Sequence, residues 1–395
     1  MQRFVCRYYK AVLLCGILVI CFQFTFSQYK VRFQINEVPS GHWPDSVFVA
    51  GSFNSWNPAA NGVAFSKING TDYIEIANLQ AGNHQFKFTR GSWQSGECNT
   101  NGNGIDNRLI DLLSDTIVEV SIKAWQDGFP VFEKRHTASP NVRIMDAAFS
   151  VPQLETTRKI WLYLPPDYAK GKKHYPVMYM HDGQNIFDEY TSGFGEWGVD
   201  ECADSLIKNG KPACIIVGID NGPNRMNEYN PYDFKDFGKG TGDQYLEFIV
   251  KNLKPYIDKH YRTLPTNDNT IIAGSSMGGL ISYYAMLRYP EVFGKGGIFS
   301  PAFWTAEEIK ELTNLSGDKL KGTLFFYVGA LEGEQYIADM KAITDKLGEN
   351  SKAFIYTVTD PAGTHNEAAW GKWFHEFYKW VLANGFNNII DLDED

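Results

Sequence analysis

The chain lacks the sequence features that are typical of nucleic-acid-binding, metal-binding and dinucleotide-binding proteins. It holds 37 Lys and Arg against 46 Asp and Glu, a net charge of −9 that leaves no basic stripe for nucleic-acid phosphates. No H-E-x-x-H or similar cluster indicates a metal, and no glycine-rich dinucleotide fingerprint or internal repeat is present. The sequence therefore predicts a protein that uses no metal or cofactor and binds no nucleic acid.

Cysteine is also too sparse for a disulfide framework. Three of the six cysteines lie within the first 21 residues, and the others are Cys98, Cys202 and Cys214. An odd number without metal-ligand spacing favours buried free thiols. A Cys202–Cys214 bridge is the alternative.

The first 27 residues have the pattern of a signal peptide. Arg3, Arg7 and Lys10 precede a mostly apolar stretch over 11–26, which ends in small residues and is short for a membrane span. We expect cleavage after residue 27, with export to the periplasm, the cell surface or the medium and no stable membrane span afterwards.

Residues 28–123 read as a small all-β, immunoglobulin-like sandwich. Alternating apolar and polar residues separated by Gly, Asn and Pro turns predict antiparallel strands. These strands cover 29–35, 46–50, 73–76, 84–88 and 116–122. A linker is expected over 124–140.

Part of this segment resembles the starch- and glycogen-binding modules attached to amylolytic enzymes. The resemblance rests on Gly51–Pro58 (GSFNSWNP), Phe86–Phe88, Trp93 and Asn107–Arg108. It implies that Trp56 and Trp93 stack on sugar rings, with Asn107 beside them. The alternative is that these tryptophans fill the sandwich core. The insert at 98–106 departs from the module family, which puts starch itself in doubt.

Residues 141–387 show strands alternating with helices, which predicts a doubly wound, mainly parallel sheet. The expected strands cover 158–164, 177–180, 214–219, 271–272, 297–299, 324–328 and 354–358. One helix is expected over 245–257. The acidic tail over 388–395, which ends in DLDED, is expected to be solvated.

A nucleophile-elbow motif lies in this second part. Gly274, Ser276 and Gly278 satisfy G-x-S-x-G, between a β-branched run and a helical pattern that begins at Leu280. A tight strand-to-helix turn would expose the serine hydroxyl and direct the helix N–H groups toward the site. The motif predicts that Ser276 is a nucleophile.

A nucleophilic serine needs a base, an acid and an oxyanion hole. His365 lies in a loop after the last expected strand, whereas His375 lies within a helical pattern. His365 is therefore the predicted base. The loop after residue 328 offers Glu332 as the acid, with Glu334 and Asp339 as competitors further along the chain.

The predicted oxyanion donors are two backbone amides. One is the N–H of Met277, which follows the nucleophile, and the other is that of Gln184, in the loop after the second strand. His181, in the same loop, is expected to be structural.

Four motifs in this order resemble the putative-esterase branch of the α/β-hydrolases. They are 179–185 (YMHDGQN), 274–279 (GSSMGG), 299–304 (FSPAFW) and 365–367 (HNE). The branch includes feruloyl and acetylxylan esterases of carbohydrate esterase family one, enterochelin esterases and S-formylglutathione hydrolases. The resemblance implies a Ser276–His365–Glu332 triad, with Trp304 and Trp370 lining the pocket or packing in the core.

Together these features predict an exported serine carboxylic-ester hydrolase. Its expected partner is an acylated polysaccharide or oligosaccharide that carries feruloyl or acetyl groups. Two alternatives remain: an esterase for siderophore trilactones of the enterochelin type, and a non-catalytic glycan-binding protein with a vestigial hydrolase domain.

Overall fold

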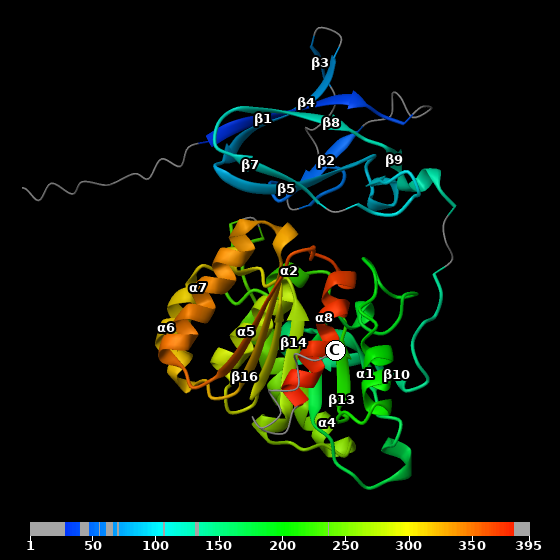
Figure 1. Ribbon diagram of the computed structural model, residues 1–395, viewed down its shortest axis with the longest axis vertical. Coiled ribbons are helices and arrows are strands. Elements are labelled where there is room, and N and C mark those ends of the chain that lie inside the picture. The colour runs from blue at the N-terminus through cyan, green and yellow to red at the C-terminus, as the bar shows by residue number, and fades with distance from the viewer. Residues whose placement is uncertain are drawn as a thin grey trace, which may run out of the picture.

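The computed structural model describes residues 28–39, 47–54, 56–60, 66–68, 71–105, 107–130, 134–235 and 237–382. The expected signal peptide over 1–27 and the acidic tail over 388–395 lie outside these ranges. The described chain forms an all-β module followed by an α/β domain (Figure 1).

The all-β module consists of two main sheets that pack face to face. Their strand orders are β3-β4-β1-β8 and β2-β5-β7, and β6 pairs with β9. The strands are β1 (Gln28–Glu37), β2 (Phe48–Gly51), β3 (Ser66–Ile68), β4 (Thr71–Gln80), β5 (Gly82–Thr89), β6 (Glu97–Cys98), β7 (Arg108–Leu112), β8 (Thr116–Ser121) and β9 (Ala124–Trp125).

Alternation along the strands explains the core of this module. In β1, Val31, Phe33 and Ile35 are buried while their neighbours are more exposed, as the period of two requires. The Phe33 and Phe86 rings from opposite sheets lie 4.7 Å apart. All five predicted strands form, and β3, β6, β7 and β9 are additional strands that the sequence analysis did not predict.

The range expected to be a linker begins inside this module. β9 pairs with β6, and the Trp125 side chain is 2% exposed within the sandwich core. After residue 133 the chain is bound along the α/β domain rather than free. There, Thr137 N–H donates to Asp188 Oδ1 at 3.1 Å and Asn141 Nδ2 donates to Asp204 Oδ1 at 2.8 Å.

The second domain is built on an eight-stranded sheet of order β10-β11-β13-β12-β14-β15-β16-β17. Only the β10–β11 and β11–β13 pairs are antiparallel, so the sheet is mostly parallel, as predicted. Its strands are β10 (Val142–Val151), β11 (Thr156–Tyr163), β12 (Val177–His181), β13 (Ile215–Ile219), β14 (Thr270–Ser275), β15 (Lys295–Phe299), β16 (Thr323–Gly329) and β17 (Phe354–Asp360).

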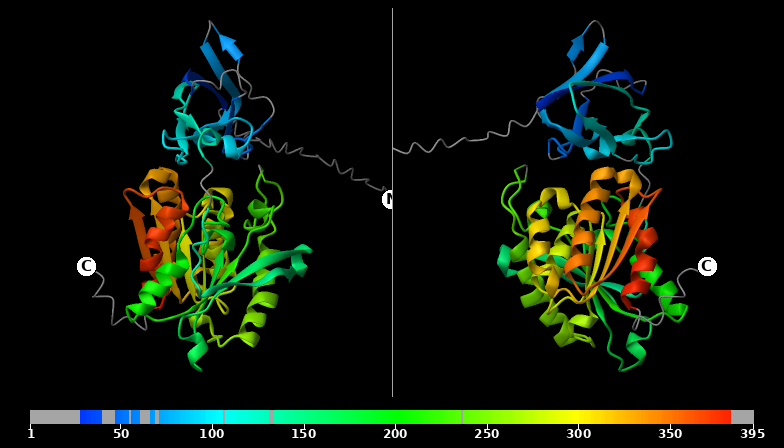
Figure 2. Two further views of the ribbon diagram at one scale, coloured as in Figure 1. Left: turned by 90° about the vertical axis from the view of Figure 1, so that its right-hand side faces the viewer. Right: turned by 60° about the vertical axis from the view of Figure 1, so that its left-hand side comes forward.

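Helices cover both faces of this sheet (Figure 2). In β12, Val177 and Tyr179 point to one core while Met178 and Met180 point to the other. The first core packs against α3 (Gly242–Phe248), α5 (Met277–Arg288), α6 (Glu308–Ser316) and α7 (Glu334–Asn350), and the second against α1 (Val199–Lys208) and α8 (Glu367–Leu382). This is the doubly wound arrangement of the α/β-hydrolase fold.

The helix expected over 245–257 forms in three parts. α3 runs through a π-helical turn, η6 (Ile249–Leu253), into α4 (Lys254–His260).

The described ranges contain no helix with the length and apolar character needed to cross a bilayer. Cys98, Cys202 and Cys214 are free thiols, as predicted, and burial raises the pKa of Cys214 to about 12.

The all-β module lies over the edge of the sheet at which the parallel strands end (Figure 1). The Lys235 side chain, in the segment between α2 (Arg225–Glu228) and α3, donates to Gln80 Oε1 of the module at 2.9 Å. The two domains therefore meet on the side where the predicted catalytic loops emerge.

Candidate active site

Ser276 occupies a strained turn between β14 and α5. Its φ is 56° and ψ is −119°, which L-residues rarely adopt. Its N–H donates to Phe299 O at 2.9 Å, and its carbonyl accepts the N–H of Ala302 at 3.0 Å. These bonds to the neighbouring strand hold the turn that the motif predicts.

Gly274 of the motif and Gly279, directly after it, are required by close backbone approach. A Cβ on Gly274 would lie 2.9 Å from the carbonyl carbon of Gly278 and 3.0 Å from the His181 ring. A Cβ on Gly279 would lie 2.7 Å from Phe299 O. The small residues therefore let the helix start directly against the strand.

Each of four neighbouring parallel strands is followed by a polar residue of the candidate site. Ser276 follows β14, Ser300 follows β15, Glu332 follows β16 and His365 follows β17. Since β14, β15, β16 and β17 are neighbours in the sheet, their carboxyl ends bring these residues to one edge.

His365 and Glu332 form a hydrogen-bonded pair. His365 Nδ1 lies 2.7 Å from Glu332 Oε2, and the Glu332 side chain is fully buried. An ionised carboxylate can only accept, so Nδ1 carries the proton and Nε2 remains as an acceptor. Glu334 is exposed and Asp339 pairs with Lys310, so Glu332 alone of the three candidate acids is placed against His365.

Ser300 is a part of the site to which the sequence analysis assigned no role. Its Oγ donates to Glu332 Oε1 at 2.6 Å and accepts the indole N–H of Trp370 at 2.9 Å. Gly329 N–H also donates to Glu332 Oε1, at 2.7 Å. Ser300 has a φ of 42°, and this unusual backbone, invisible in a motif, directs the hydroxyl toward the acid.

The loop after β12 places the second predicted oxyanion donor. It forms a 3₁₀ turn, η5 (Gly183–Asn185), after Asp182 in the left-handed conformation. A Cβ on Gly183 would lie 2.8 Å from Gly218 C and Ile219 N of β13, so only glycine allows this approach. The first N–H groups of η5 and of α5 lack acceptors within their own turns, and these include the Gln184 and Met277 amides.

Buried charges hold this loop. Arg225 Nε and Nη2 donate to the two oxygens of Asp182 at 2.7 and 2.8 Å. Burial opposes ionisation of Asp182, but the charge and hydrogen bonds of Arg225 lower its pKa below the usual value.

Glu367 adds a second carboxyl beside this pair. Asn185 Nδ2 donates to Glu367 Oε1 at 3.2 Å, which links the oxyanion loop to the segment that carries His365. Burial, followed by the charge of Asp182, raises the pKa of Glu367 to about 7.

His181 is buried beneath the elbow. Its Nδ1 lies 2.8 Å from the Tyr245 hydroxyl, and burial lowers its pKa to about 3. A neutral, enclosed imidazole here agrees with the structural role expected for it.

The two tryptophans expected near the pocket lie in different surroundings. Trp370 is 5% exposed, and its ring edge packs on His365 at a centroid distance of 5.0 Å. Trp304 is half-buried and donates to the Tyr336 hydroxyl, whose ring lies 5.2 Å from that of His365. Phe234 packs on Trp304 at 5.7 Å and extends this aromatic wall.

In the all-β module, the two tryptophans predicted to contact sugar lie close together. The Trp56 and Trp93 rings are 6.2 Å apart at 39°, Trp93 is 37% exposed, and neither ring belongs to the sandwich core. Asn107 Nδ2 donates to Gln85 Oε1 at 2.8 Å.

The family model described as putative esterase matches residues 152–380 of the chain. Two curated relatives illustrate the range of similarity. An uncharacterized protein of Bacillus subtilis, YbbA, is 32% identical over 188 residues, which cover 45% of this chain and 70% of that protein. An endo-1,4-beta-xylanase/feruloyl esterase of Xylanibacter ruminicola is 34% identical over 154 residues, 38% of this chain but 20% of that protein.

Solved structures share the fold at low identity. The BES protein of Bacillus cereus aligns with a TM-score of 0.52 and 19% identity, over 65% of this chain and 100% of that one. The enterobactin esterase FES of Shigella flexneri aligns with a TM-score of 0.51 and 16% identity, over 86% and 90%. The second alignment is long enough to extend beyond the α/β domain.

Proposed function

The chain belongs to the putative esterase family and is a carboxylic ester hydrolase, and on that premise we propose that Ser276, His365 and Glu332 form its catalytic triad. The observation that carries the proposal is the 2.7 Å hydrogen bond between His365 and Glu332, at the sheet edge where Ser276 occupies its strained turn.

The reaction proceeds through an acyl-enzyme. His365 Nε2 takes the proton of Ser276 Oγ as this oxygen bonds to the ester carbonyl carbon, and the amides of Met277 and Gln184 stabilise the oxyanion. The carbon–oxygen bond to the alcohol then breaks, and the alcohol leaves with the proton from His365.

Water completes the cycle. It gives a proton to His365 and bonds to the acyl carbon, the acid departs, and Ser276 regains its proton. Glu332 keeps Nδ1 protonated throughout, so that Nε2 always faces the reacting atoms.

The substrate we propose is an acylated polysaccharide or oligosaccharide outside the cytoplasm, with feruloyl or acetyl as the acyl group. The paired Trp56 and Trp93 rings offer flat apolar surface to a sugar. The feruloyl esterase relative and the signal-like residues 1–27 support this assignment. Trp304 and Phe234 provide an aromatic wall for the acyl group, whereas buried Trp370 acts by packing behind His365.

A siderophore trilactone is the second candidate substrate. The alignment with the enterobactin esterase covers most of both chains, which favours a common arrangement of the β-module and the hydrolase domain. The third alternative from the sequence, a non-catalytic glycan-binding protein with a vestigial hydrolase domain, is disfavoured by the His365–Glu332 hydrogen bond of the proposed triad.

A fluorophosphonate probe tests the nucleophile. We expect it to label the wild type and Ser275→Ala but not Ser276→Ala; equal labelling of Ser276→Ala would refute the assignment. Hydrolysis of methyl ferulate, acetylated xylan and a ferric trilactone, each compared with Ser276→Ala, then separates the substrates. Activity confined to the trilactone would exclude the polysaccharide substrate.

A further inference from the structure

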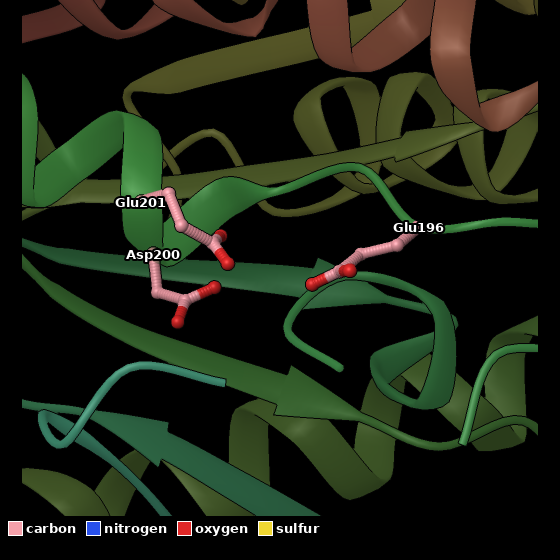
Figure 3. Close-up of side chains that lie close together, drawn as sticks. All are labelled: Glu196, Asp200 and Glu201. Atoms are coloured by element: carbon pink, nitrogen blue, oxygen red, sulfur yellow. The ribbon is translucent and has the colours of Figure 1, made fainter. Parts of the chain in front are cut away.

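A group of three carboxylates lies where the linker meets the hydrolase domain. Glu196, Asp200 and Glu201 each place an oxygen within 4.8 Å of the other two. Figure 3 shows the carboxylates of Asp200 and Glu201 side by side near the start of α1, with that of Glu196 directed toward them from the preceding loop.

The hydrogen bonds of this acidic cluster account for only some of its oxygens. Thr137 Oγ1 donates to Glu196 Oε2 at 2.7 Å, and Ser139 N–H donates to Asp200 Oδ2 at 2.6 Å. The other oxygens of these two residues, Glu196 Oε1 and Asp200 Oδ1, are buried and accept no hydrogen bond. Asp200 is 0% exposed, so water cannot solvate its free oxygen.

Within the described ranges, no ion pair involves any of the three acids. The amino terminus of α1 favours negative charge but supplies no donor to the free oxygens. Asp200 and Glu201 can relieve their repulsion by a hydrogen bond that requires one shared proton, and a divalent cation can take the place of that proton.

We propose that Glu196, Asp200 and Glu201 bind a calcium ion. Calcium takes carboxylate oxygens at about 2.3–2.6 Å, so oxygens on opposite sides of the ion are separated by up to about 5 Å, which accommodates this cluster. Magnesium requires a tighter octahedron at about 2.0–2.1 Å.

The position of the cluster gives the ion a structural role. Thr137 and Ser139 belong to the linker, so the ion ties the linker to the start of α1. Trp197 N–H, next to Glu196, donates to Asn185 O at 3.0 Å, and Asn185 belongs to the oxyanion loop. Calcium would thus stabilise one segment that both docks the linker and supports the catalytic loop.

The test is thermal unfolding of the full chain, treated with EDTA, dialysed and titrated with CaCl₂. At a calcium concentration about 100 times the Kd we expect the Tm to rise by about 5–10 °C. Isothermal titration should give one site per chain. Glu201→Gln and Asp200→Asn should lose this shift, whereas Glu189→Gln, which removes a nearby exposed carboxylate, should retain it.

Two results would overturn the proposal. An unchanged wild-type Tm would mean that Asp200 and Glu201 share a proton instead of binding an ion. A full shift in Glu201→Gln, whose exposed side chain tolerates the change, would place the calcium elsewhere. Fluorophosphonate labelling of Ser276 in the same samples is independent of both outcomes, so the nucleophile proposal is tested separately.

Discussion

The carboxylate of Glu332 accepts hydrogen bonds from three groups: the His365 ring, the Ser300 hydroxyl and the Gly329 amide. Glu332→Gln would place an amide N–H₂ against Nδ1–H or the other donors and favour the wrong histidine tautomer. We expect kcat on p-nitrophenyl acetate to fall about 10³- to 10⁴-fold. Glu334→Gln, at the exposed start of α7, should stay within about twofold of wild type. If Glu332→Gln retained half of wild-type kcat, the acid would have to be another residue.

Glu367 makes stability depend on pH. Its pKa rises from 4.5 to about 7 on folding, so the folded chain holds this proton more tightly and loses stability as pH rises through that interval. Glu367→Gln, which keeps the acceptor for Asn185, should raise the free energy of unfolding at pH 8 by about 3 kcal/mol and leave it nearly unchanged at pH 4.

Urea unfolding at several pH values measures this effect. Glu349→Gln, a change at an exposed carboxyl near the end of α7, is the matched control and should show no such pH dependence. A Glu367→Gln curve parallel to that of the wild type at all pH values would contradict the prediction.

Single residues differ in how much the sequence reveals about them. Ser276 lies in a motif whose first glycine, Gly274, is required by close backbone approach, and His365 follows a strand pattern in the right order. Ser300 lies in a stretch quoted for its resemblance, yet its role depends on a positive φ and on side chains from β16 and α8. Contacts between segments so far apart in the chain leave no local signature.

At the scale of elements, η5 depends on the absence of a side chain at Gly183. Gly183→Ala would push the turn away from β13 and move the Gln184 amide. We expect about a 10²-fold loss in kcat and about 1–3 kcal/mol of destabilisation. Gly193→Ala is the control, because a Cβ there meets nothing within 4 Å. Equal activities of the two variants would remove η5 from the proposed oxyanion hole.

The central elements were predictable because they are buried. β12 and β13 are buried along their whole length and, apart from His181 at the end of β12, consist of apolar residues and glycine, so their sequences predict interior parallel strands. β10 was missed because it is an edge strand whose side chains are mostly half-exposed and interrupted by register shifts. The π-helical turn in η6 was also missed, since a one-residue change in hydrogen bonding leaves the apolar pattern intact.

At the scale of the whole molecule, the two domains are expected to separate binding from chemistry. Trp93→Ala should weaken binding to insoluble polysaccharide about tenfold, the equivalent of about 1.4 kcal/mol, because it removes half of the exposed aromatic pair. Its kcat on p-nitrophenyl acetate should not change. Leu113→Ala, another exposed apolar position of the module, is the control in a pull-down assay. Unimpaired binding by Trp93→Ala would exclude this sugar site.

The division into a sandwich and a doubly wound domain could be predicted from the sequence. The first part of the chain shows only strand patterns, whereas the second shows strand patterns that alternate with helical ones. The docking of residues 134–141 could not be predicted, because a polar segment rich in turn formers looks the same whether it is free or hydrogen-bonded to acids. Asp188 binds its middle, at Thr137, and Asp204 binds its last residue, Asn141.

This docking limits the distance by which the sandwich can move away from the α/β domain. Five peptide steps along the chain separate Phe129, whose N–H donates to Gln126 O of η2 (Gln126–Gly128), from Lys134, which donates to Ser192 O. Fully extended, they span at most about 18 Å. If the sandwich binds a glycan, the active site can therefore reach only the esters within a few sugar units of the bound position. Esters should then be removed in local clusters rather than at random along the polymer.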